Sequence, residues 1–321
     1  MRKGWKTVLT VCLVVALIGA TLLAAGIAAG GKLSFNVDLN RHRVNTGEVE
    51  LVRGEYTPSH VSALVVDVDV ADITLETGDA WRVEYALYYE PEIAERDGTL
   101  TLTAGGRGDW PNIGVNFGVK KAPYLRVTVP ESTALGAIEL RLDVGDTEVR
   151  NLTLSSLQAQ IDVGDLAIRG IVTDSLNAAL NVGDCVVSGA AVLGDAELGC
   201  GVGDLRCDHL RTDGALHVYT DTGDIDLDFV TAASILAETD TGDIDMESPE
   251  SGSINAATDT GEISAVLPGA ETVYNLELRS NVGDVELNGR GRGNDYTARG
   301  GEKTFTATTD VGDVEVKFAA P

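Results

Sequence analysis

Acidic residues recur at a fixed place beside glycine, and their oxygen atoms are of the kind that bind hard cations. One residue after each of nine glycines stands a carboxylate: Asp146, Asp165, Asp184, Asp204, Asp224, Asp243, Glu262, Asp284 and Asp313. If equivalent positions stack at the spacing of β-strands, neighbouring carboxylates lie roughly 5 Å apart, which costs about 0.8 kcal/mol per pair in water. Some interaction must offset this repulsion.

Two interpretations of the acidic row stay open. In the first, each Asp accepts hydrogen bonds from nearby backbone N–H groups of a turn while its charge points into solvent. In the second, carboxylates of adjoining repeats bind Ca²⁺, the one cofactor that the sequence suggests. The candidate calcium ligands lie in two Asp-Thr-Gly-Asp-Ile-Asp segments and are Asp221, Asp224, Asp226, Asp240, Asp243 and Asp245. Neither segment matches the EF-hand loop or the glycine-rich nonapeptide repeat.

No catalytic motif accompanies the acidic row. The chain has four His, and it lacks an H-E-x-x-H segment, a G-x-S-x-G elbow and a Gly-rich phosphate loop. His209 and His217 are interpreted as surface residues. A catalytic pair of acids should interrupt a repeat at one place, whereas these acids follow it. The sequence therefore favours a protein that is not an enzyme and assigns no catalytic residue; the alternative is a carbohydrate-active enzyme on a β-helix scaffold.

The acids belong to an internal repeat with a period of about 20 residues. Its recurring glycines are Gly145, Gly164, Gly183, Gly203, Gly223, Gly242, Gly261, Gly283 and Gly312, and only the last two follow longer spacings. Two and four residues after each Gly stand mostly apolar side chains with a polar one between them, which predicts a strand buried on one face. A further apolar column is expected twelve residues after the Gly, at Leu157, Leu176, Ala215, Ile235, Ile254 and Val273. The Gly itself is expected to supply a positive φ at a tight corner.

A unit this short cannot enclose a core, so the repeats are expected to stack. The sequence predicts an all-β fold, a single-stranded, β-helix-like β-solenoid of 19–20-residue rungs over residues 131–318. Nine rungs would extend for roughly 40 Å. Small residues such as Ala159 and Ala178 suit a narrow core and agree with an aromatic content of 5%. Residues 60–130 carry a less regular pattern, which predicts an irregular β cap and the first rungs.

The N-terminal segment carries a membrane signal. Arg2, Lys3 and Lys6 precede the uncharged residues 7–31, which are long enough to cross a hydrocarbon core of ~30 Å as a helix. Positive residues stay in the cytoplasm, so the rest of the chain should lie outside the cell. We predict a single-pass membrane anchor at 1–31, a juxtamembrane spacer at 32–59 and an extracellular C-terminal domain. A cleaved signal peptide is the alternative.

The charge of the chain limits its partners. The sequence has 24 Lys and Arg against 50 Asp and Glu, a formal charge of −26, and all but three of the basic residues follow residue 31. Such a surface repels the phosphate backbone of nucleic acids and attracts cations. The expected partners are cationic peptides or components of the cell envelope.

Three cysteines lie close together in the repeat region, at Cys185, Cys200 and Cys207. Two of them stand in apolar columns, so packing in the core is the first expectation. Oxidation of one pair is the alternative, because the predicted compartment is outside the cell.

Several segments resemble a known bacterial family. Besides the recurring Gly-Asp strands they are Val70-Ala71-Asp72-Ile73, Gly114-Val115-Asn116-Phe117-Gly118 and Arg126-Val127-Thr128-Val129-Pro130. Over residues 60–318 the chain resembles the bacterial "putative adhesin" family of surface β-strand-repeat proteins, a domain of unknown function. The resemblance implies a β-solenoid, often anchored by one N-terminal helix in Gram-positive bacteria, and some relatives belong to envelope-stress systems that respond to membrane-active peptides. It implies no catalytic residue. We therefore expect a membrane-anchored binding, adhesion or envelope-scaffold protein of the cell surface that recognises cationic or polymeric ligands.

Overall fold

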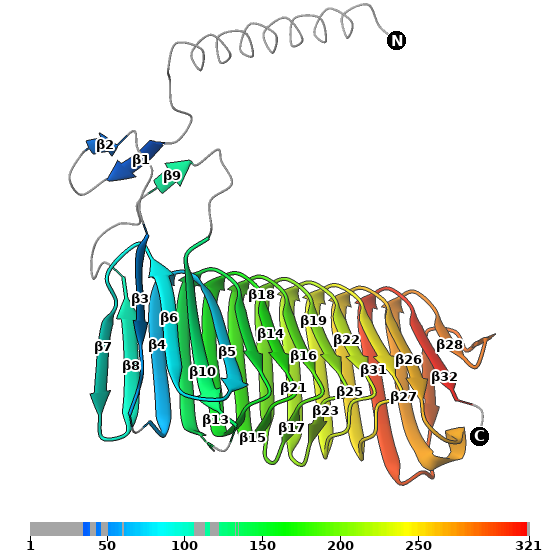
Figure 1. Ribbon diagram of the computed structural model, residues 1–321. Helices are drawn as coiled ribbons and strands as arrows, with labels where there is room; N and C mark the ends of the chain where they lie inside the picture. Colours follow the sequence, from blue (N-terminus) through cyan, green and yellow to red (C-terminus); the bar gives the residue numbers. More distant parts are fainter. Residues whose placement is uncertain are drawn as a thin grey trace, which may run out of the picture. The chain divides into compact units, whose positions relative to one another are not determined.

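The computed structural model (Figure 1) describes residues 51–59, 61–105, 122–131, 133 and 135–319, and the backbone of three short strands elsewhere. The chain forms two compact units, residues 1–50 with 106–121 and residues 51–105 with 122–321. In the first unit the three short strands form an antiparallel sheet in the order β2 (Arg43–Asn45), β1 (Phe35–Asp38) and β9 (Ile113–Val115). The predicted anchor at 1–31 lies outside the described residues. Among the residues that are described, no helix has the length and apolar character needed to cross a membrane.

The second unit is an all-β solenoid built from two large sheets. The long-strand sheet contains, in spatial order, β30 (Asp295–Ala298), β27 (Tyr274–Val282), β31 (Lys303–Val311), β25 (Ser253–Thr260), β23 (Ser234–Thr241), β21 (Ala215–Thr222), β18 (Ala196–Val202), β15 (Val172–Val182), β13 (Thr153–Val163), β11 (Leu135–Val144), β4 (Ala63–Val70), β8 (Thr99–Ala104) and β7 (Glu92–Arg96). Two further short strands belong to it: β17 (Ala191–Val192) pairs with β15, and β20 (Arg211–Thr212) pairs with β17. The short-strand sheet contains β29 (Arg290–Gly291), β28 (Val285–Leu287), β32 (Val314–Phe318), β26 (Ile263–Leu267), β24 (Ile244–Glu247), β22 (Ile225–Asp228), β19 (Leu205–Asp208), β16 (Cys185–Ser188), β14 (Leu166–Arg169), β12 (Thr147–Arg150), β5 (Asp72–Gly78), β10 (Tyr124–Pro130), β6 (Arg82–Leu87) and β3 (Val52–Tyr56). Each regular rung contributes one strand to the short-strand sheet and one long strand to the other sheet, and two rungs add the short strands β17 and β20.

Successive rungs stack in parallel with equivalent positions in register. Leu166 is the partner of Thr147 on one side and of Cys185 on the other, which reproduces the repeat of the sequence. The predicted positive φ at the corner is confirmed, since the nine repeat glycines have φ between +140° and +155°. A Cβ added to Gly164 would also lie 1.9 Å from the carbonyl oxygen of Gly145 in the preceding rung. Conformation and close stacking therefore both require Gly at the corner.

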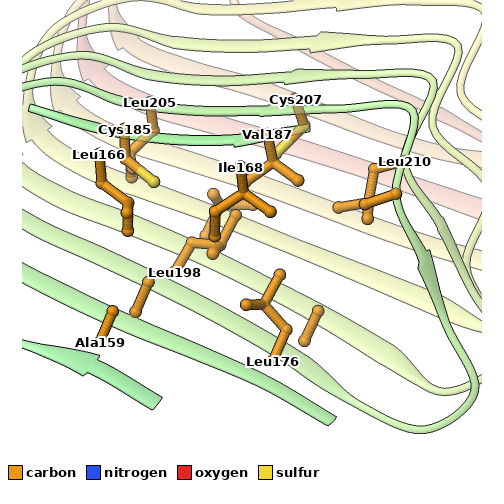
Figure 2. Packing of buried hydrophobic residues seen from close by; sticks show 14 of the residues in the cluster. Ala159, Leu166, Ile168, Leu176, Cys185, Val187, Leu198, Leu205, Cys207 and Leu210 are labelled. Atoms are coloured by element: carbon orange, nitrogen blue, oxygen red, sulfur yellow. The ribbon is translucent and has the colours of Figure 1, made fainter. Parts of the chain in front are cut away.

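The core lies between the two sheets, and its side chains follow the predicted alternation. In β13 the buried residues alternate with exposed ones along most of the strand. The columns two and four residues after the Gly are buried in every regular rung. Figure 2 shows how Leu166, Ile168 and Val187 of one sheet and Ala159 and Leu198 of the other belong to one apolar cluster. Small side chains in this narrow space are the physical reason for the low aromatic content.

Two members of the third predicted apolar column are wrong. Ala215 is exposed and Val273 is 39% exposed, while their neighbours Leu216 and Tyr274 are buried. The rung that ends at Gly223 is one residue longer than the rung after it, so its buried position shifts by one and Leu216 becomes the partner of Ile235. Val273 belongs to the only 3-10 turn of the described residues, η1 (Glu271–Val273), which links β26 to β27.

Rungs at both ends of the solenoid are out of chain order. The rung of β31 and β32 lies between the rung of β25 and β26 and the rung of β27 and β28. At the other end, the rung of β4 and β5 lies between β11 and β12 on one side and β8 and β10 on the other. The longer spacings before Gly283 and Gly312 thus belong to the two connections by which the chain first skips one position in the stack and then returns to fill it.

Antiparallel strands close both ends of the stack. They cover strand edges that the terminal rungs would otherwise expose. β7 pairs with β8, and β6 and β3 continue the short-strand sheet. At the C-terminal end β29 pairs with β28 and β30 with β27. The strand β3 begins at Val52, within residues 32–59 for which the sequence predicts a spacer.

Candidate functional site

The acidic row after the corner glycines forms a ladder of hydrogen bonds from one rung to the next. In each step one Oδ1 atom accepts the backbone N–H of the equivalent acidic residue in the following rung. The N···O distances are 2.7–3.0 Å for the six acceptors Asp146, Asp165, Asp184, Asp204, Asp224 and Asp243. Each carboxylate thus satisfies a corner N–H of the next rung. The corner acids therefore accept backbone N–H groups, as the first interpretation predicts, but the donor lies in the next rung rather than in the same turn.

Some carboxylates beside this ladder are costly to ionise. Burial is the main cause that raises the pKa of Asp226, and the nearby Arg206 opposes the rise. Burial also raises the pKa of Asp245, and the charge of its register partner Asp226 adds to the effect. For Glu262 burial is again the first cause of a raised pKa, followed by repulsion from Asp243 and Asp313. In the long-strand sheet, burial raises the pKa of Asp143, and repulsion from Asp69 and Asp162 adds to the effect. The repulsion expected from the sequence is therefore found on both sheets.

The six predicted calcium ligands are divided among three places. Asp221 and Asp240 are the next-to-last residues of β21 and β23 in the long-strand sheet. Asp224 and Asp243 occupy the corner ladder. Asp226 and Asp245 are register partners in the short-strand sheet. Within the described ranges, no group of three or more His, Cys, Asp or Glu side chains is arranged so that it could hold a metal ion. The calcium site stays a prediction from the sequence, and calorimetry with Ca²⁺ is its test.

A groove crosses the outer face of the long-strand sheet over β18, β21, β23 and β25. Its volume is about 470 Å³, and it is lined by Glu197, His217, Tyr219, Thr220, Asp221, Glu238, Thr239, Asp240, Ala257 and Asp259. Gly199 is the register partner of Tyr219, and a Cβ added to Gly199 would lie 2.1 Å from Cζ of the ring. The ring therefore lies over the bare backbone of Gly199. Gly201, on the same face of β18, also carries no side chain.

Acidic side chains surround this ring. His217 lies beside Tyr219, with ring centroids 5.2 Å apart, and its Nε2 atom is 3.3 Å from Oε2 of Glu238. Asp221, Asp240 and Asp259 are exposed at equivalent positions of three neighbouring strands, β21, β23 and β25. No Lys or Arg is among the lining residues. A half-buried aromatic side chain that is surrounded by carboxylates is suited to bind an organic cation. The face of the aromatic ring and the negative charges both attract such a cation.

A second groove, of about 410 Å³, lies on the outer face of the short-strand sheet and has a different character. It is lined partly by the ladder residues Asp146, Asp165 and Asp184, and also by Glu148 and Arg169. The guanidinium of Arg169 donates to Glu148 at 2.8 Å, so a cation and an anion already neutralise each other there. No aromatic residue lines it. The groove at Tyr219 is therefore the better candidate for a functional site.

The two histidines and the three cysteines of the repeat region are accounted for by the structure. His209 is exposed, packs on Phe229 and contacts Asp208, whereas His217 lines the groove at Tyr219. Cys185, Cys200 and Cys207 are buried and free, as the packing expectation requires. Burial raises the pKa of the Cys207 thiol to about 12, so this thiol stays protonated and unreactive.

The sequence predicts His217 only as a surface residue, and it does not reveal the groove. Tyr219 stands four residues before its corner Gly, where the other rungs from Arg141 to Thr308 carry no aromatic residue. A comparison of outward positions between neighbouring rungs would place Gly199 beside Tyr219. Such a comparison uses the residues of the outer face, whereas the apolar alternation describes only the inner face.

The comparisons with known proteins concern the solenoid. A model of the Toastrack DUF4097 family matches residues 61–317. Among solved structures, a "putative adhesin" of Bacteroides fragilis has 17% identity and a TM-score of 0.46, with 84% of this chain and 98% of that chain covered. A "putative lipid binding protein" of Parabacteroides distasonis has 11% identity and a TM-score of 0.46, with 85% and 98% covered. A "putative adhesin" of the same species has 12% identity and a TM-score of 0.41, with 85% and 98% covered.

None of the curated proteins matches the chain. The family match covers both sheets, the nine corner glycines and the rungs at both ends that are out of chain order. It confirms the family resemblance inferred from the Gly-Asp strands. The chain belongs to the Toastrack DUF4097 family.

Proposed function

We propose that this protein is a non-enzymatic binding protein of the cell surface that captures ammonium or guanidinium groups of a peptide or polymer. The observation that carries the proposal is the Tyr219 ring, which lies over Gly199 in a groove that is lined by five carboxylates and by no Lys or Arg. A cation above an aromatic face gains about 0.5–2 kcal/mol, and the surrounding carboxylates add to it. Membrane-active cationic peptides, of the kind expected from the family resemblance, carry such groups.

The rest of the surface supports the same class of ligand. The chain carries a formal charge of −26, and carboxylates follow the solenoid corner from rung to rung. A field of one sign along a rod concentrates cations near it and speeds their encounter. A repeating ligand with positive groups can therefore meet many weak contacts around one specific groove. This combination suits an adhesion or envelope-scaffold role.

The cell-surface location is part of the proposal and rests on the sequence. Residues 7–31 are apolar and uncharged, and they follow three basic residues. We place the solenoid outside the cell on a single-pass anchor. Protease added to intact cells should then remove the solenoid. The membrane fraction should retain an N-terminal fragment that still contains residues 1–31. Release of a mature chain that begins near residue 31 would show a cleaved signal peptide instead.

Calorimetry with the full chain in mild detergent tests the ligand class. The probes are an oligolysine and an oligomer of glucosamine, with the N-acetylated oligomer and a polyglutamate as neutral and anionic counterparts. We expect both cationic probes to bind and the other two to give no heat. Binding should weaken as salt increases. Equal binding of the neutral and cationic sugar oligomers would contradict the cationic ligand class.

Matched variants locate the binding. Tyr219→Ala should weaken the binding of oligolysine at least about tenfold, which corresponds to about 1.4 kcal/mol. Tyr296→Ala is the control, because Tyr296 lies in β30 at the end of the stack, next to Arg292. Glu238→Gln should weaken binding as well. If Tyr219→Ala and Tyr296→Ala bind alike, the groove is not the site.

A carbohydrate-active enzyme at the same groove is the second candidate, and one observation favours it. The carboxyl groups of Glu238 and Asp240 lie in one groove with His217. Carboxyl groups that flank a sugar bond are the usual catalytic groups of glycosidases. Release of reducing ends from cell-wall polysaccharide, lost in Glu238→Gln or Asp240→Asn, would support this candidate. Stable binding without turnover would support the binding protein.

A further inference from the structure

The C-terminal rung, residues 303–318 with β31 and β32, occupies a slot inside the stack. It pairs in parallel with β25 and β26 on one side and with β27 and β28 on the other. The rung that follows it in space, residues 274–287, precedes it in the chain. The connecting residues 288–302 hold five glycines and the small cap strands β29 and β30. The slot is therefore filled by a rung that comes later in the chain than both of its neighbours and follows a Gly-rich connection.

The two end rungs carry the same chemistry at the same positions. Residues 282–286 and residues 311–315 both read Val-Gly-Asp-Val-Glu. Three residues before the corner Gly, the Ser280 hydroxyl donates to the carbonyl of Gly312 at 2.7 Å, and the Thr309 hydroxyl donates to that of Gly261 at 3.0 Å. Apolar residues Leu276 and Phe305 are register partners in the core. Either rung can therefore dock on β25 and β26 with equivalent hydrogen bonds.

This equivalence makes an open state accessible. If residues 303–318 leave the slot, residues 274–287 can take their place against β25 and β26 and recover one rung interface. Each rung of a solenoid contacts only its neighbours, so the opening does not involve the rest of the stack. Like charges also oppose insertion, because the inserted rung adds one more acid to the corner row, with Asp313 standing between Glu262 and Asp284.

We propose that the slot is an exchange site, in which the C-terminal rung of one copy of this chain is replaced by the same rung of a second copy. Exchange restores every contact of the closed slot and joins two solenoids through their C-terminal ends. An identical element provides the complementary surface, so no new interface has to be built. The partner is thus a second copy, and the element exchanged is residues 303–318.

A pair of variants, each with one added cysteine, detects the exchange in the full chain in detergent. Ala257 and Thr308 are register partners on the outer face of β25 and β31. Neighbouring strands lie about 4.8 Å apart, within reach of a disulfide. Ala257→Cys and Thr308→Cys copies, mixed below the melting temperature under weak oxidation, should form a disulfide-linked heterodimer. Low salt should speed its formation, because repulsion then acts more strongly against the inserted rung.

An internal pair is the matched control. Glu238 and Ala257 are register partners in β23 and β25, which keep their chain order. Glu238→Cys and Ala257→Cys copies should give at least about tenfold less heterodimer, because β23 and β25 are consecutive both in the chain and in the stack. Cys12 is present in every variant, so this control also corrects for crosslinks through it.

The double variant Ala257→Cys with Thr308→Cys in one chain shows whether the geometry permits the bond. Its intramolecular disulfide should stop exchange, and reduction should restore it. If it closes while the mixed single variants give no more heterodimer than the internal control, the proposal is wrong. Native mass spectrometry of mixed isotopically heavy and light chains decides independently of any disulfide, since mixed dimers are expected with exchange and only unmixed species without it.

Discussion

The carboxylate of Asp224 accepts the backbone N–H of Asp243 at 2.8 Å, one rung further along the solenoid. Asp224→Ala leaves that N–H to water, and we expect a loss of about 1 kcal/mol in the free energy of unfolding. Asp224→Asn keeps an acceptor oxygen and should lose less. Asp240→Ala, two residues before the next corner Gly, is the control. Chemical denaturation measures all three, and equal losses for Asp224→Ala and Asp240→Ala would contradict the role of the ladder.

Gly223→Ala should destabilise the solenoid strongly. Gly223 has φ +149°, and an added Cβ would lie 2.0 Å from the carbonyl oxygen of Gly203. We expect a loss of at least about 3 kcal/mol, from backbone strain and from the separation of two rungs. Gly189→Ala is the matched control, because Gly189 has φ +59° and nothing within 4 Å of the added atom. It should cost about 1 kcal/mol, and similar melting temperatures for the two variants would argue against corner stacking.

Thr147→Val should stabilise the protein. Thr147 stands in a buried column that the other regular rungs fill with Leu, Ile, Val or Cys, and its Oγ1 is buried without a hydrogen-bond partner. Removing that hydroxyl should gain about 1 kcal/mol in the free energy of unfolding. Thr173→Val is the counterpart, since the buried Thr173 hydroxyl donates to the carbonyl of Ser175 at 2.9 Å. It should destabilise, so changes of the same sign would refute the explanation.

The raised carboxyl pKa values predict a gain in stability on mild acidification. An acid whose pKa is higher in the folded protein holds its proton more tightly there, so its contribution falls as pH rises through the interval above the ordinary carboxyl value. Burial raises the pKa of Asp245 above 3.8 and that of Glu262 above 4.5. Asp245→Asn should therefore raise the melting temperature at pH 7, and its advantage should shrink as the pH is lowered toward 4. Glu302→Gln, at an exposed position before β31, should show no such dependence.

Gly199→Ala should weaken ligand binding at the Tyr219 groove and leave most of the stability intact. The added Cβ would lie 2.1 Å from the far end of the Tyr219 ring, so the ring must move away from the face of β18. We expect a reduction in oligolysine affinity of about tenfold or less, because the ring loses its position but not its chemistry. Unchanged affinity would mean that the ring position does not matter for binding.

Patterns that repeat were predictable from the sequence, and features that break the pattern were not. The corner role of Gly223 and the burial of Ile225 and Leu227 follow from period and alternation, because every rung meets the same neighbours. The column at Ala215 failed because one extra residue in its rung shifts the inward position. The groove at Tyr219 depends on a register partner in the preceding rung, on the outer face, where no apolar pattern marks the register.

The order of the end rungs was hidden for a different reason. Residues 282–286 and residues 311–315 are identical, so the sequence next to Gly261 is equally compatible with either. Only the longer spacings, from Gly261 to Gly283 and from there to Gly312, indicate that the chain passes over a rung. The local sequence determines that both segments form rungs. Which of the two rungs lies next to β25 and β26 depends on how the end of the stack is capped.

The insertion of residues 303–318 between two earlier rungs also sets the order of events during synthesis. A chain that leaves the ribosome from its N-terminus can stack the middle rungs one by one as each appears. When residue 287 has emerged, the rung 274–287 can dock only on the rung 253–267, and we expect residues 303–318 to displace it from there when they emerge. Folding at this end then finishes with a rearrangement of docked rungs, which a chain that lacks residues 303–318 would not undergo.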